Sequence, residues 1–314
     1  MVAVEKIEYV AYGQPDLAET ERFLVEFGLT VAQSSPTEVI MRGADGGHCY
    51  IARAEGPQGL QSIGMRVRSM AELEEAAGYP EASPIAPIER PGGGNLVRLT
   101  SPDGIVFELV QGAAPAAAHD MRSPLVLNHA REKRRQGGSQ RPALEPAMIN
   151  RLGHVALLTA DYRRNADWLA DRLGLRPSDV LFDGDPSNML GGFFHCGGAG
   201  GWTDHHTIAL FPAERPGVHH CSFEVLDLDA QFMGNKYLKL KGRTPFWGVG
   251  RHILGSQIFD YWLDPAGNIV EHFADTDVVL PGTQPGFHQV SDDSLAMWGP
   301  PIAVADFIGG ARRG

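Results

Sequence analysis

The sequence has few cysteines and no segment that resembles a membrane anchor or a secretion signal. Its three cysteines, Cys49, Cys196 and Cys221, are an odd number without CxxC spacing, which argues against a disulfide framework and favours a reducing cytoplasm. No apolar run reaches the roughly 18 residues that a membrane helix needs. The first residues, MVAVEKIEYVAYG, lack the basic start and apolar stretch of a signal peptide. We therefore expect a cytoplasmic protein without membrane contact.

Positive charge is also scarce. Lysine and arginine total 27 against 38 aspartates and glutamates, which gives a net charge of −11. An acidic chain of this kind lacks the electrostatic footprint of a nucleic-acid-binding protein. One basic run, residues 131–135, lies in a polar stretch, and we interpret it as a solvated surface segment. The 314 residues of the chain are enough for two domains of ordinary size.

What the sequence does contain is an internal repeat. A strand-like segment at residues 6–11 precedes an amphipathic helix at 15–28, and the same pair recurs at 151–158 and 161–174. Each half also has a strand that follows a glycine, and each closes with a tight turn that leads into a strand. A repeat of this length predicts two domains of the same fold.

The composition between and after the repeats indicates the domain boundaries. We predict an N-terminal domain at 1–112 and a C-terminal domain at 149–273. Residues 113–148 are rich in proline, alanine and charge, and we interpret them as a linker. Residues 274–314 contain several prolines and glycines with little periodicity, which predicts an irregular tail that wraps the C-terminal domain.

Histidines stand on the predicted strands of the second half, and strand alternation indicates which of them face inward. Along residues 219–225 the even positions are polar, beginning with His220, whereas the odd positions are apolar after His219. Since the apolar face should pack against helices, we expect His220 to point into a cavity and His219 away from it. The same rule places His205 in the cavity and His206 on the apolar face.

A further group of residues has a spacing that is typical of one enzyme family. It consists of a Gly-x-His, a tyrosine, an Asp-Pro-x-Gly turn and a glutamate, which stand in this sequence as Gly250, His252, Tyr261, Asp264, Pro265, Gly267 and Glu271. With this motif and the internal repeat, the chain resembles the vicinal oxygen chelate superfamily, and within it the two-domain type I extradiol dioxygenases. The resemblance covers nearly the whole chain. It implies an α+β, two-domain vicinal oxygen chelate fold, with paired βαβββ modules forming an open barrel in each domain.

The resemblance implies a metal site made by His154, His220 and Glu271. Two histidines and one carboxylate from separate strands form the facial triad of non-haem iron enzymes, which leaves coordination positions open on one side of the ion. Those positions suit a chelating diol and O₂. We therefore expect Fe(II) as the cofactor, with Mn(II) as the alternative that the same ligands would accept.

Three further residues match the acid–base groups of the family. The resemblance implies that His205, fifteen residues before His220, faces the O₂ position, and that His252 and Tyr261 hydrogen-bond the bound diol. Histidine suits proton transfer because its pKa lies near neutrality, and a tyrosine hydroxyl can donate to a developing oxyanion. One residue departs from the pattern, since Asp260 stands where the family usually has an aliphatic residue.

The N-terminal half provides an internal comparison for the metal site. Tyr9 stands where the second half has His154, and Ser62 stands where it has His220. Of the three ligand positions only the carboxylate, Glu108, is kept. We therefore expect the first domain to bind no metal and to support the fold and an oligomer.

These features predict Fe(II)-dependent extradiol cleavage of a catechol-type aromatic by O₂ to a 2-hydroxymuconic semialdehyde-type product, in aromatic compound catabolism. Two alternatives stay open on the same fold: another metal enzyme, either glyoxalase-like or a keto-acid dioxygenase, and a non-catalytic binding protein. The ring substituents of the substrate are not determined, and Arg251 or Arg243 is a candidate partner for a carboxylated ring. The resemblance also implies a homo-oligomer.

Overall fold

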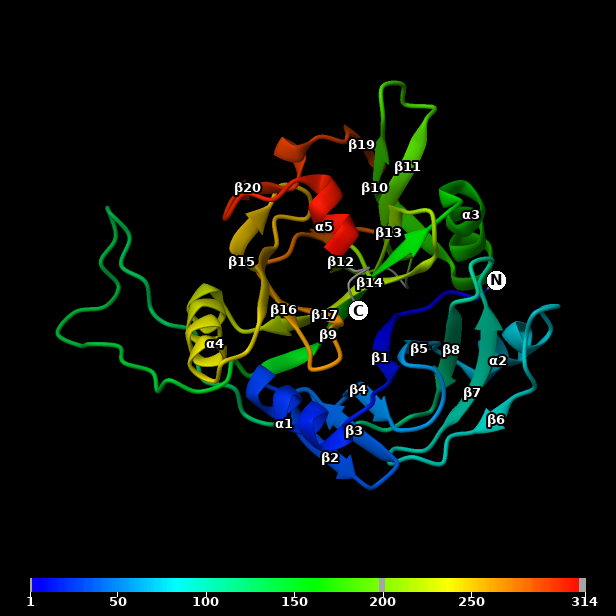
Figure 1. Ribbon diagram of the computed structural model, residues 1–314, viewed down its shortest axis with the longest axis horizontal. Helices are drawn as coiled ribbons and strands as arrows, with labels where there is room; N and C mark the ends of the chain where they lie inside the picture. Colours follow the sequence, from blue (N-terminus) through cyan, green and yellow to red (C-terminus); the bar gives the residue numbers. More distant parts are fainter. Residues whose placement is uncertain (1, 198–200, 311–314) are drawn as a thin grey trace.

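The computed structural model of the protein describes residues 2–197 and 201–310 (Figure 1). The first half of the chain contains, in order, β1 (Lys6–Gly13), α1 (Leu17–Phe27), β2 (Thr30–Ser34), β3 (Glu38–Arg42), β4 (His48–Arg53), β5 (Gly59–Arg66), α2 (Met70–Ala77), β6 (Ala86–Pro87), β7 (Asn95–Thr100) and β8 (Val106–Gln111). None of the helices among the described residues is long and apolar enough to span a membrane.

The second half repeats this order and then adds a tail. It contains β9 (Ile149–Thr159), α3 (Tyr162–Leu173), β10 (Leu175–Phe182), β11 (Met189–Cys196), β12 (Thr203–Asp204), β13 (Ile208–Pro212), β14 (Gly217–Val225), α4 (Leu228–Leu240), β15 (Pro245–His252), β16 (Ile258–Leu263) and β17 (Ile269–Ala274). The tail contains β18 (Val278–Val279), β19 (Gly286–Gln289), the 3₁₀ helix η1 (Asp292–Ser294), β20 (Ala296–Trp298) and α5 (Val304–Gly310).

The predicted first helix of each half is confirmed, and both have the ends that their sequences favour. Asp16 and Asp161 cap the N-termini of α1 and α3, where each carboxylate accepts a backbone N–H from the first turn. Gly28 and Gly174 end the same helices with positive φ angles of 118° and 68°. Glycine adopts this left-handed conformation without steric cost, so the chain can turn directly into the next strand.

Each half of the chain forms one mixed sheet. The strand order is β2-β3-β4-β1-β5-β8-β7-β6 in the first sheet and β19-β10-β11-β13-β9-β14-β17-β16-β15-β20 in the second. The centre of each sheet is an antiparallel pair, β1 with β5 or β9 with β14, and a βαβββ module extends to either side of it. This order confirms the predicted two-domain fold of paired βαβββ modules.

The second sheet curves around a single cavity. Residues from seven of its strands, β9, β10, β11, β13, β14, β15 and β16, line the same pocket. Neighbouring strands lie about 4.8 Å apart, so strands this far apart in a flat sheet could not reach one space. The sheet is therefore the open barrel that the resemblance implied, and its interior is available for a site.

The tail is more regular than its composition suggests. β19 pairs in parallel with β10 at one edge of the second sheet, and β20 pairs with β15 at the other edge. The expectation of an irregular tail was wrong because these strands are short and are held by partners more than forty residues away, which local periodicity does not detect. After β20, α5 lies over the mouth of the barrel (Figure 1).

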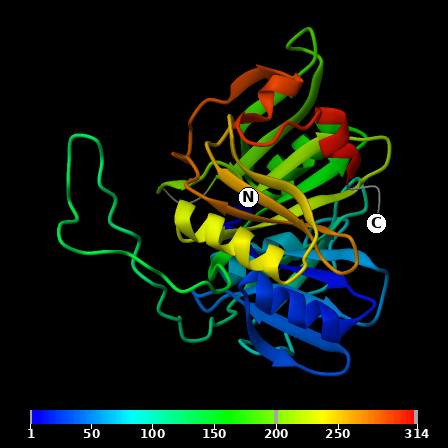
Figure 2. The same cartoon turned by 60° about the vertical axis from the view of Figure 1, so that its left-hand side comes forward.

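The segment between Gln111 and Ile149 contains no helix or strand among its described residues. It leaves the body of the molecule as a long loop beside α4 and returns to β9 (Figures 1 and 2). At its return, the backbone of Ile149 exchanges hydrogen bonds with Gly28 and Ala44 of the first domain. The predicted linker segment is thus fixed to the first domain where the second begins.

The two sheets share one hydrophobic core. The largest cluster of buried side chains runs from Val2 to Ala274 and contains residues of both halves. His272 of β17 donates from Nε2 to the carbonyl oxygen of Phe27 at 2.6 Å, and its ring stacks on the Phe27 ring at 3.8 Å. Arg243 binds Glu19 and Glu26 of α1 at 2.5 and 2.6 Å. The strand that contains Glu271 is therefore held by the first domain through His272.

Candidate metal centre

Three neighbouring strands bring His154, His220 and Glu271 together. β14 pairs with β9 on one side and with β17 on the other, and Ser222 lies opposite both His154 and Glu271. His220 is two residues from Ser222 on β14, so its side chain lies on the same face of the sheet. One ligand atom from each of the three buried residues lies within 4.8 Å of the others. The structure thus forms a site of two histidines and one glutamate that can hold a metal ion.

The turn before β17 determines the position of Glu271. The Asp264 carboxylate accepts the backbone N–H groups of Ala266 and Asn268 at 2.9 and 2.8 Å. This side-chain cap holds the Asp-Pro-x-Gly turn that the sequence motif indicated, with Gly267 at a φ of 88°. Gln14 of the first domain also donates to Asp264 at 2.8 Å. The turn is therefore held from both domains.

The three side chains fit a divalent cation. Within the described chain, neither carboxylate oxygen of Glu271 has a well-aligned hydrogen-bond donor, although Nε2 of His154 and of His220 lie 3.2 and 3.4 Å from its Oε2. Nε2 of His154 is also 3.3 Å from Nε2 of His220. A buried carboxylate without a donor is costly, and a cation between the three groups would remove that cost.

The first domain lacks this arrangement at the equivalent place. Tyr9, Ser62 and Glu108 occupy the same register positions on β1, β5 and β8 as the triad residues on β9, β14 and β17. Here the carboxylate has donors, because Glu108 accepts from the Tyr9 hydroxyl at 2.5 Å and from Nε of Arg98 at 2.9 Å. The unpartnered carboxylate is thus a feature of the second domain and not of the fold.

His219 lies on the cavity side of β14, and the prediction that it faces away from the cavity was wrong. The register between β14 and β9 shifts between Val218 and His220, which is a β-bulge. A bulge interrupts strict alternation and turns two successive side chains toward one face. The His219 ring consequently packs on Phe307 at 4.5 Å and on Phe211 at 5.6 Å, both at the cavity.

This position allows His219 to fix the tautomer of His220. Nε2 of His219 lies 2.8 Å from the carbonyl oxygen of Phe307, which can only accept a hydrogen bond. Burial lowers the pKa of His219 to about 4, so the ring is neutral and its Nδ1 must be an acceptor. Nδ1 of His220 is 2.6 Å away and donates to it. The lone pair of His220 therefore lies on Nε2, the atom that faces Glu271.

Of the adjacent residues His205 and His206, the structure places His206 in the pocket. The His206 ring lies 4.2 Å from the His154 ring and lines the cavity, whereas His205 does not line it. The sequence prediction was wrong because residues 205–207 lie between β12 and β13 and belong to neither strand, so alternation does not apply to them. The cavity position expected for His205 is thus occupied by His206.

His205 instead connects His206 to a buried carboxylate. Nε2 of His205 is 2.8 Å from Oδ2 of Asp179, and its Nδ1 is 3.1 Å from Nδ1 of His206. Burial would raise the pKa of Asp179, but hydrogen bonds from His205 and His288 hold it below its ordinary value. Asp179 can only accept, so Nε2 of His205 donates to it, and in the tautomer with its single proton on Nε2 His205 accepts at Nδ1 from His206. Nε2 of His206 then carries a lone pair, and it has no hydrogen-bond partner among the described residues.

His252 and Tyr261 lie together at the cavity, on β15 and β16. Nδ1 of His252 is 2.8 Å from the carbonyl oxygen of Leu295, so this nitrogen carries the proton. Nε2 of His252 then accepts from the Tyr261 hydroxyl at 2.9 Å. Burial, followed by the charge of Glu271, raises the pKa of Tyr261 well above its usual value, so its hydroxyl stays protonated. Burial lowers the pKa of His252, which keeps it neutral.

Asp260, which departs from the family's pattern, does not reach the site. Its carboxylate accepts from Trp262 Nε1 at 2.7 Å and from Asn235 Nδ2 at 2.9 Å on the outer side of the sheet. Burial raises its pKa to about 7. Two hydrogen bonds on the outer side of the sheet therefore satisfy the carboxyl that stands in place of an aliphatic residue.

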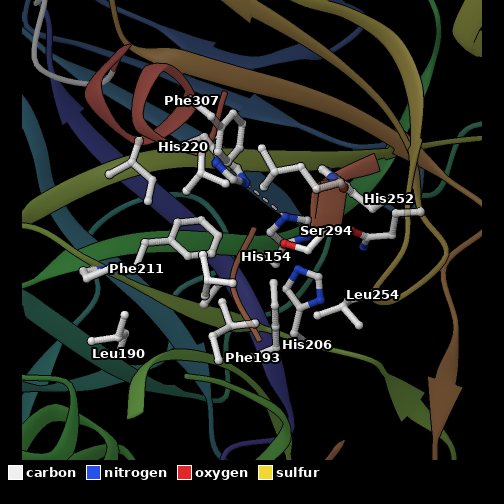
Figure 3. A pocket seen from close by; sticks show the side chains of 18 of the residues that line it. His154, Leu190, Phe193, His206, Phe211, His220, His252, Leu254, Ser294 and Phe307 are labelled. Carbon is white, nitrogen blue, oxygen red and sulfur yellow. Dashed lines mark hydrogen bonds between the residues drawn. The ribbon is translucent and has the colours of Figure 1, made fainter. Parts of the chain in front are cut away.

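Six aromatic side chains form a closed loop around the pocket. Successive ring centroids are 4.2 to 6.4 Å apart in the order His154, His206, Phe193, Phe211, Phe307, His220 and back to His154. Figure 3 shows the loop, with His154 and His220 facing each other and Phe211 and Phe307 on the side away from His252. Such a loop suits a flat ring that enters with one edge toward the triad.

Several residues of the site could not be identified from sequence patterns. Phe307 and Leu295 come from the tail, and their carbonyl oxygens set the tautomers of His219 and His252. Backbone carbonyl groups carry no residue-type signature, so no motif could identify them. Residues 204–211 have the sequence pattern of one strand, and the interruption between Asp204 and Ile208 that brings His206 to the cavity has no signal in the sequence.

Comparison with known proteins places the chain among enzymes of this fold. Residues 151–272 match the model of the Glyoxalase/Bleomycin resistance protein/Dioxygenase superfamily. Metapyrocatechase 2 from Cupriavidus necator is 33% identical over 304 residues, which cover 96% of this chain and 90% of the relative.

Solved structures match the chain over almost its full length. The Mn(II)-bound glyoxalase from Novosphingobium aromaticivorans superposes with a TM-score of 0.80 at 26% identity, covering 98% of this chain and 95% of that one. Homoprotocatechuate 2,3-dioxygenase from Brevibacterium fuscum, in complex with 3,4-dihydroxyphenylacetate, gives a TM-score of 0.80 at 19% identity, covering 98% and 92%. At that identity the second match shows the fold alone.

Proposed function

Because the chain belongs to the extradiol ring-cleavage dioxygenases of the glyoxalase and dioxygenase superfamily, we propose that it opens a catechol-type ring next to its diol with O₂. The product would be of the 2-hydroxymuconic semialdehyde type. The observation that supports this proposal best is the buried triad of His154, His220 and Glu271 at the end of an aromatic pocket. Iron(II) is the metal we propose, with Mn(II) as the alternative.

The triad residues would hold the metal through Nε2 of His220, a ring nitrogen of His154 and the Glu271 carboxylate. When bound, Fe(II) supplies Lewis acidity toward the diol and electron transfer toward O₂. Two neutral imidazoles and one carboxylate leave a net charge of +1 on a divalent ion, which one catecholate charge neutralises. Burial lowers the pKa of His220 well below its usual value, which favours the neutral form that binds a metal.

The remaining polar residues at the pocket would hold protons at defined atoms. Nε2 of His206 carries a lone pair and would accept a proton from the diol or return it to the oxygen that develops charge. The Tyr261 hydroxyl donates its own proton to Nε2 of His252, so its oxygen would be the acceptor for a diol O–H. We therefore assign to His206 the acid–base role that the sequence assigned to His205.

Aerobic turnover of catechol tests the proposed function. Protein loaded anaerobically with Fe(II) is mixed with catechol in air, and O₂ uptake is followed together with the yellow ring-fission product. Equimolar O₂ and catechol consumption is expected, with both lost in His154→Ala, which removes a ligand. Colour without O₂ uptake, or equal turnover by metal-free protein, would contradict the proposal.

The similarity to a Mn(II)-bound glyoxalase makes an isomerase the second candidate. That reaction needs no O₂, so incubating the Mn(II)-loaded protein with methylglyoxal and glutathione under nitrogen separates the two. We expect no thioester product, because the described residues near the triad provide only one carboxylate.

Three further statements belong to the same proposal. Residues 149–273 would form the catalytic domain, while residues 1–112 would carry structure and assembly. The protein would act in the cytoplasm, since its three cysteines are buried free thiols. It would be a homo-oligomer, and light scattering of the purified protein measures its copy number.

A further inference from the structure

We infer that the substrate carries an uncharged, apolar ring substituent, either alkyl or aryl, and not a carboxylate. This inference rests on the proposed function and extends it to the substrate class. It follows from what lines the pocket beyond the triad, from where the cations near the site are engaged, and from the charge balance at the metal.

The pocket is polar only near the diol position. Besides the two histidine ligands, its polar lining residues are His206, His252, Tyr261, Gln257 and Ser294. The rest of the lining is apolar, and includes Leu181, Leu190, Pro212, Val290, Val304 and Ile308. In Figure 3, Phe211 and Leu190 lie on the opposite side of His154 from His252. A substituent that points away from the acid–base residues therefore meets hydrocarbon.

No described residue that lines the pocket is a lysine or an arginine. Both arginines that the sequence suggested as carboxylate partners are engaged elsewhere. Arg251 binds Asp275 at 2.8 Å and the Ser256 carbonyl at 2.6 Å, outside the cavity. Arg243 bridges to α1 of the first domain. Neither is a partner for a carboxylated ring at this site.

The charge at the site is also already balanced. One catecholate charge neutralises the divalent ion with Glu271, so no positive charge is left for a second anionic group. A second buried carboxylate, Asp179, is connected to the pocket residue His206 through His205 and adds negative charge outside the lining. A substituent carboxylate would be desolvated without a partner, whereas an alkyl or aryl group gains from burial.

Competition between substrates measures this preference. The kcat/KM of the Fe(II)-loaded protein is compared for catechol, 4-butylcatechol, 3-phenylcatechol and 3,4-dihydroxyphenylacetate. We expect at least one apolar substrate to exceed the carboxylated one by about 100-fold or more. Calorimetry with the redox-inert Zn(II) form, which does not turn over, should show the same order in affinity.

A cationic side chain introduced into the apolar part of the pocket lining tests whether the lack of a cation there causes this preference. Leu190 is only partly buried on β11, so a longer polar side chain fits there without disrupting the core. Leu190→Arg should raise the kcat/KM for 3,4-dihydroxyphenylacetate by about 10-fold and lower that for 4-butylcatechol. Leu190→Gln, which is polar but uncharged, is the matched control. It should lower the kcat/KM for 4-butylcatechol without raising that for 3,4-dihydroxyphenylacetate.

Each failure has a distinct signature. If catechol itself is not opened, the proposed function fails. If catechol is opened but the carboxylated substrate is as good as the alkylated ones, only the apolar inference is overturned. A chain ending at Gly310 serves as a second control, since it lacks Arg312 and Arg313, which lie outside the described residues. We expect its substrate order to be unchanged.

Discussion

At the residue scale, adjacent histidines with different roles are the main feature of the site. In both the His205–His206 and the His219–His220 pair, one ring faces the triad and its neighbour accepts the Nδ1 proton. The neighbour is in turn fixed by an acceptor, the Asp179 carboxylate or the Phe307 carbonyl. The lone pair needed for metal binding or proton transfer is thereby placed on Nε2 before any ligand arrives.

The first prediction separates the two residues of the first pair. His206→Ala should lower kcat by about 100-fold or more, because general acid–base catalysis contributes at least that much. His205→Ala should lower it by only about 10-fold, because His206 stays in the pocket with a less well-defined tautomer. Stopped-flow turnover gives both values, and iron content should stay unchanged in both variants. A larger loss in His205→Ala would return the catalytic role to His205.

The second prediction concerns Asp260. Its folded-state pKa of about 7 lies above the ordinary value of 3.8, so between these pH values the folded protein binds more protons than the unfolded chain. The contribution of this group to the free energy of unfolding therefore falls as pH rises from about 4 to 7. Asp260→Asn keeps a polar side chain for Trp262 and removes the titration.

We expect urea midpoints of the wild type to decrease relative to Asp260→Asn across this pH range, and the two curves to run parallel above it. Asn235 can turn its amide so that its oxygen accepts from the new side chain, which preserves the local packing. Equal pH dependence in the two proteins would show that the carboxyl ionises normally when buried.

At the scale of elements, regular strands were predictable and their interruptions were not. Periodicity located α1, α3 and the strands of the triad, and the Asp-Pro-x-Gly turn indicated where the strand that contains Glu271 begins. Alternation failed at the bulge beside His219 and in the gap before β13. A bulge depends on pairing with a distant strand, so one strand's sequence does not reveal it.

The tail helix α5 connects to the metal site through His219, which gives the third prediction. His219→Leu should remove the acceptor for the His220 Nδ1 proton and lower the affinity of the triad for Mn(II) by about 10 to 100-fold. Phe307→Leu is the matched control, because it keeps the backbone carbonyl that binds His219 and replaces the ring that lines the pocket and packs on His219 with a smaller apolar side chain.

Calorimetric titration of the metal-free proteins with Mn(II) measures both affinities without turnover. We expect Phe307→Leu to bind Mn(II) like the wild type but to bind 4-butylcatechol more weakly. Equal Mn(II) affinity in His219→Leu and wild type would mean that the hydrogen bond from His220 to His219 does not affect metal binding through Nε2 of His220.

At the scale of the whole molecule, the two domains share a core, although only one of them has a metal triad among its described residues. The internal repeat predicted two similar domains, but a repeat does not reveal how they pack. The contact of His272 with Phe27 joins the residue after Glu271 directly to the end of α1. Metal binding to the second domain should therefore stabilise the first.

The fourth prediction follows from this shared core. Mn(II) at about 100 times its dissociation constant should add about 2.7 kcal/mol to the free energy of unfolding. The strands β4 and β5 pack in the core that also contains β14 and β17. Mn(II) binding should therefore slow amide exchange in β4 and β5 by the same factor as in the second domain. Hydrogen exchange followed by mass spectrometry compares the two domains with and without Mn(II).

Phe27→Ala tests whether the α1 contact transmits this effect. The substitution removes the ring that stacks on His272 and should cost about 3 to 5 kcal/mol of stability, while leaving the carbonyl that accepts from Nε2. Slower exchange should then be confined to the second domain when Mn(II) binds. If Mn(II) slows exchange in the first domain of this variant as much as in the second, the coupling runs through the rest of the shared core. If Mn(II) does not slow exchange in the first domain of the wild type, the two domains unfold independently.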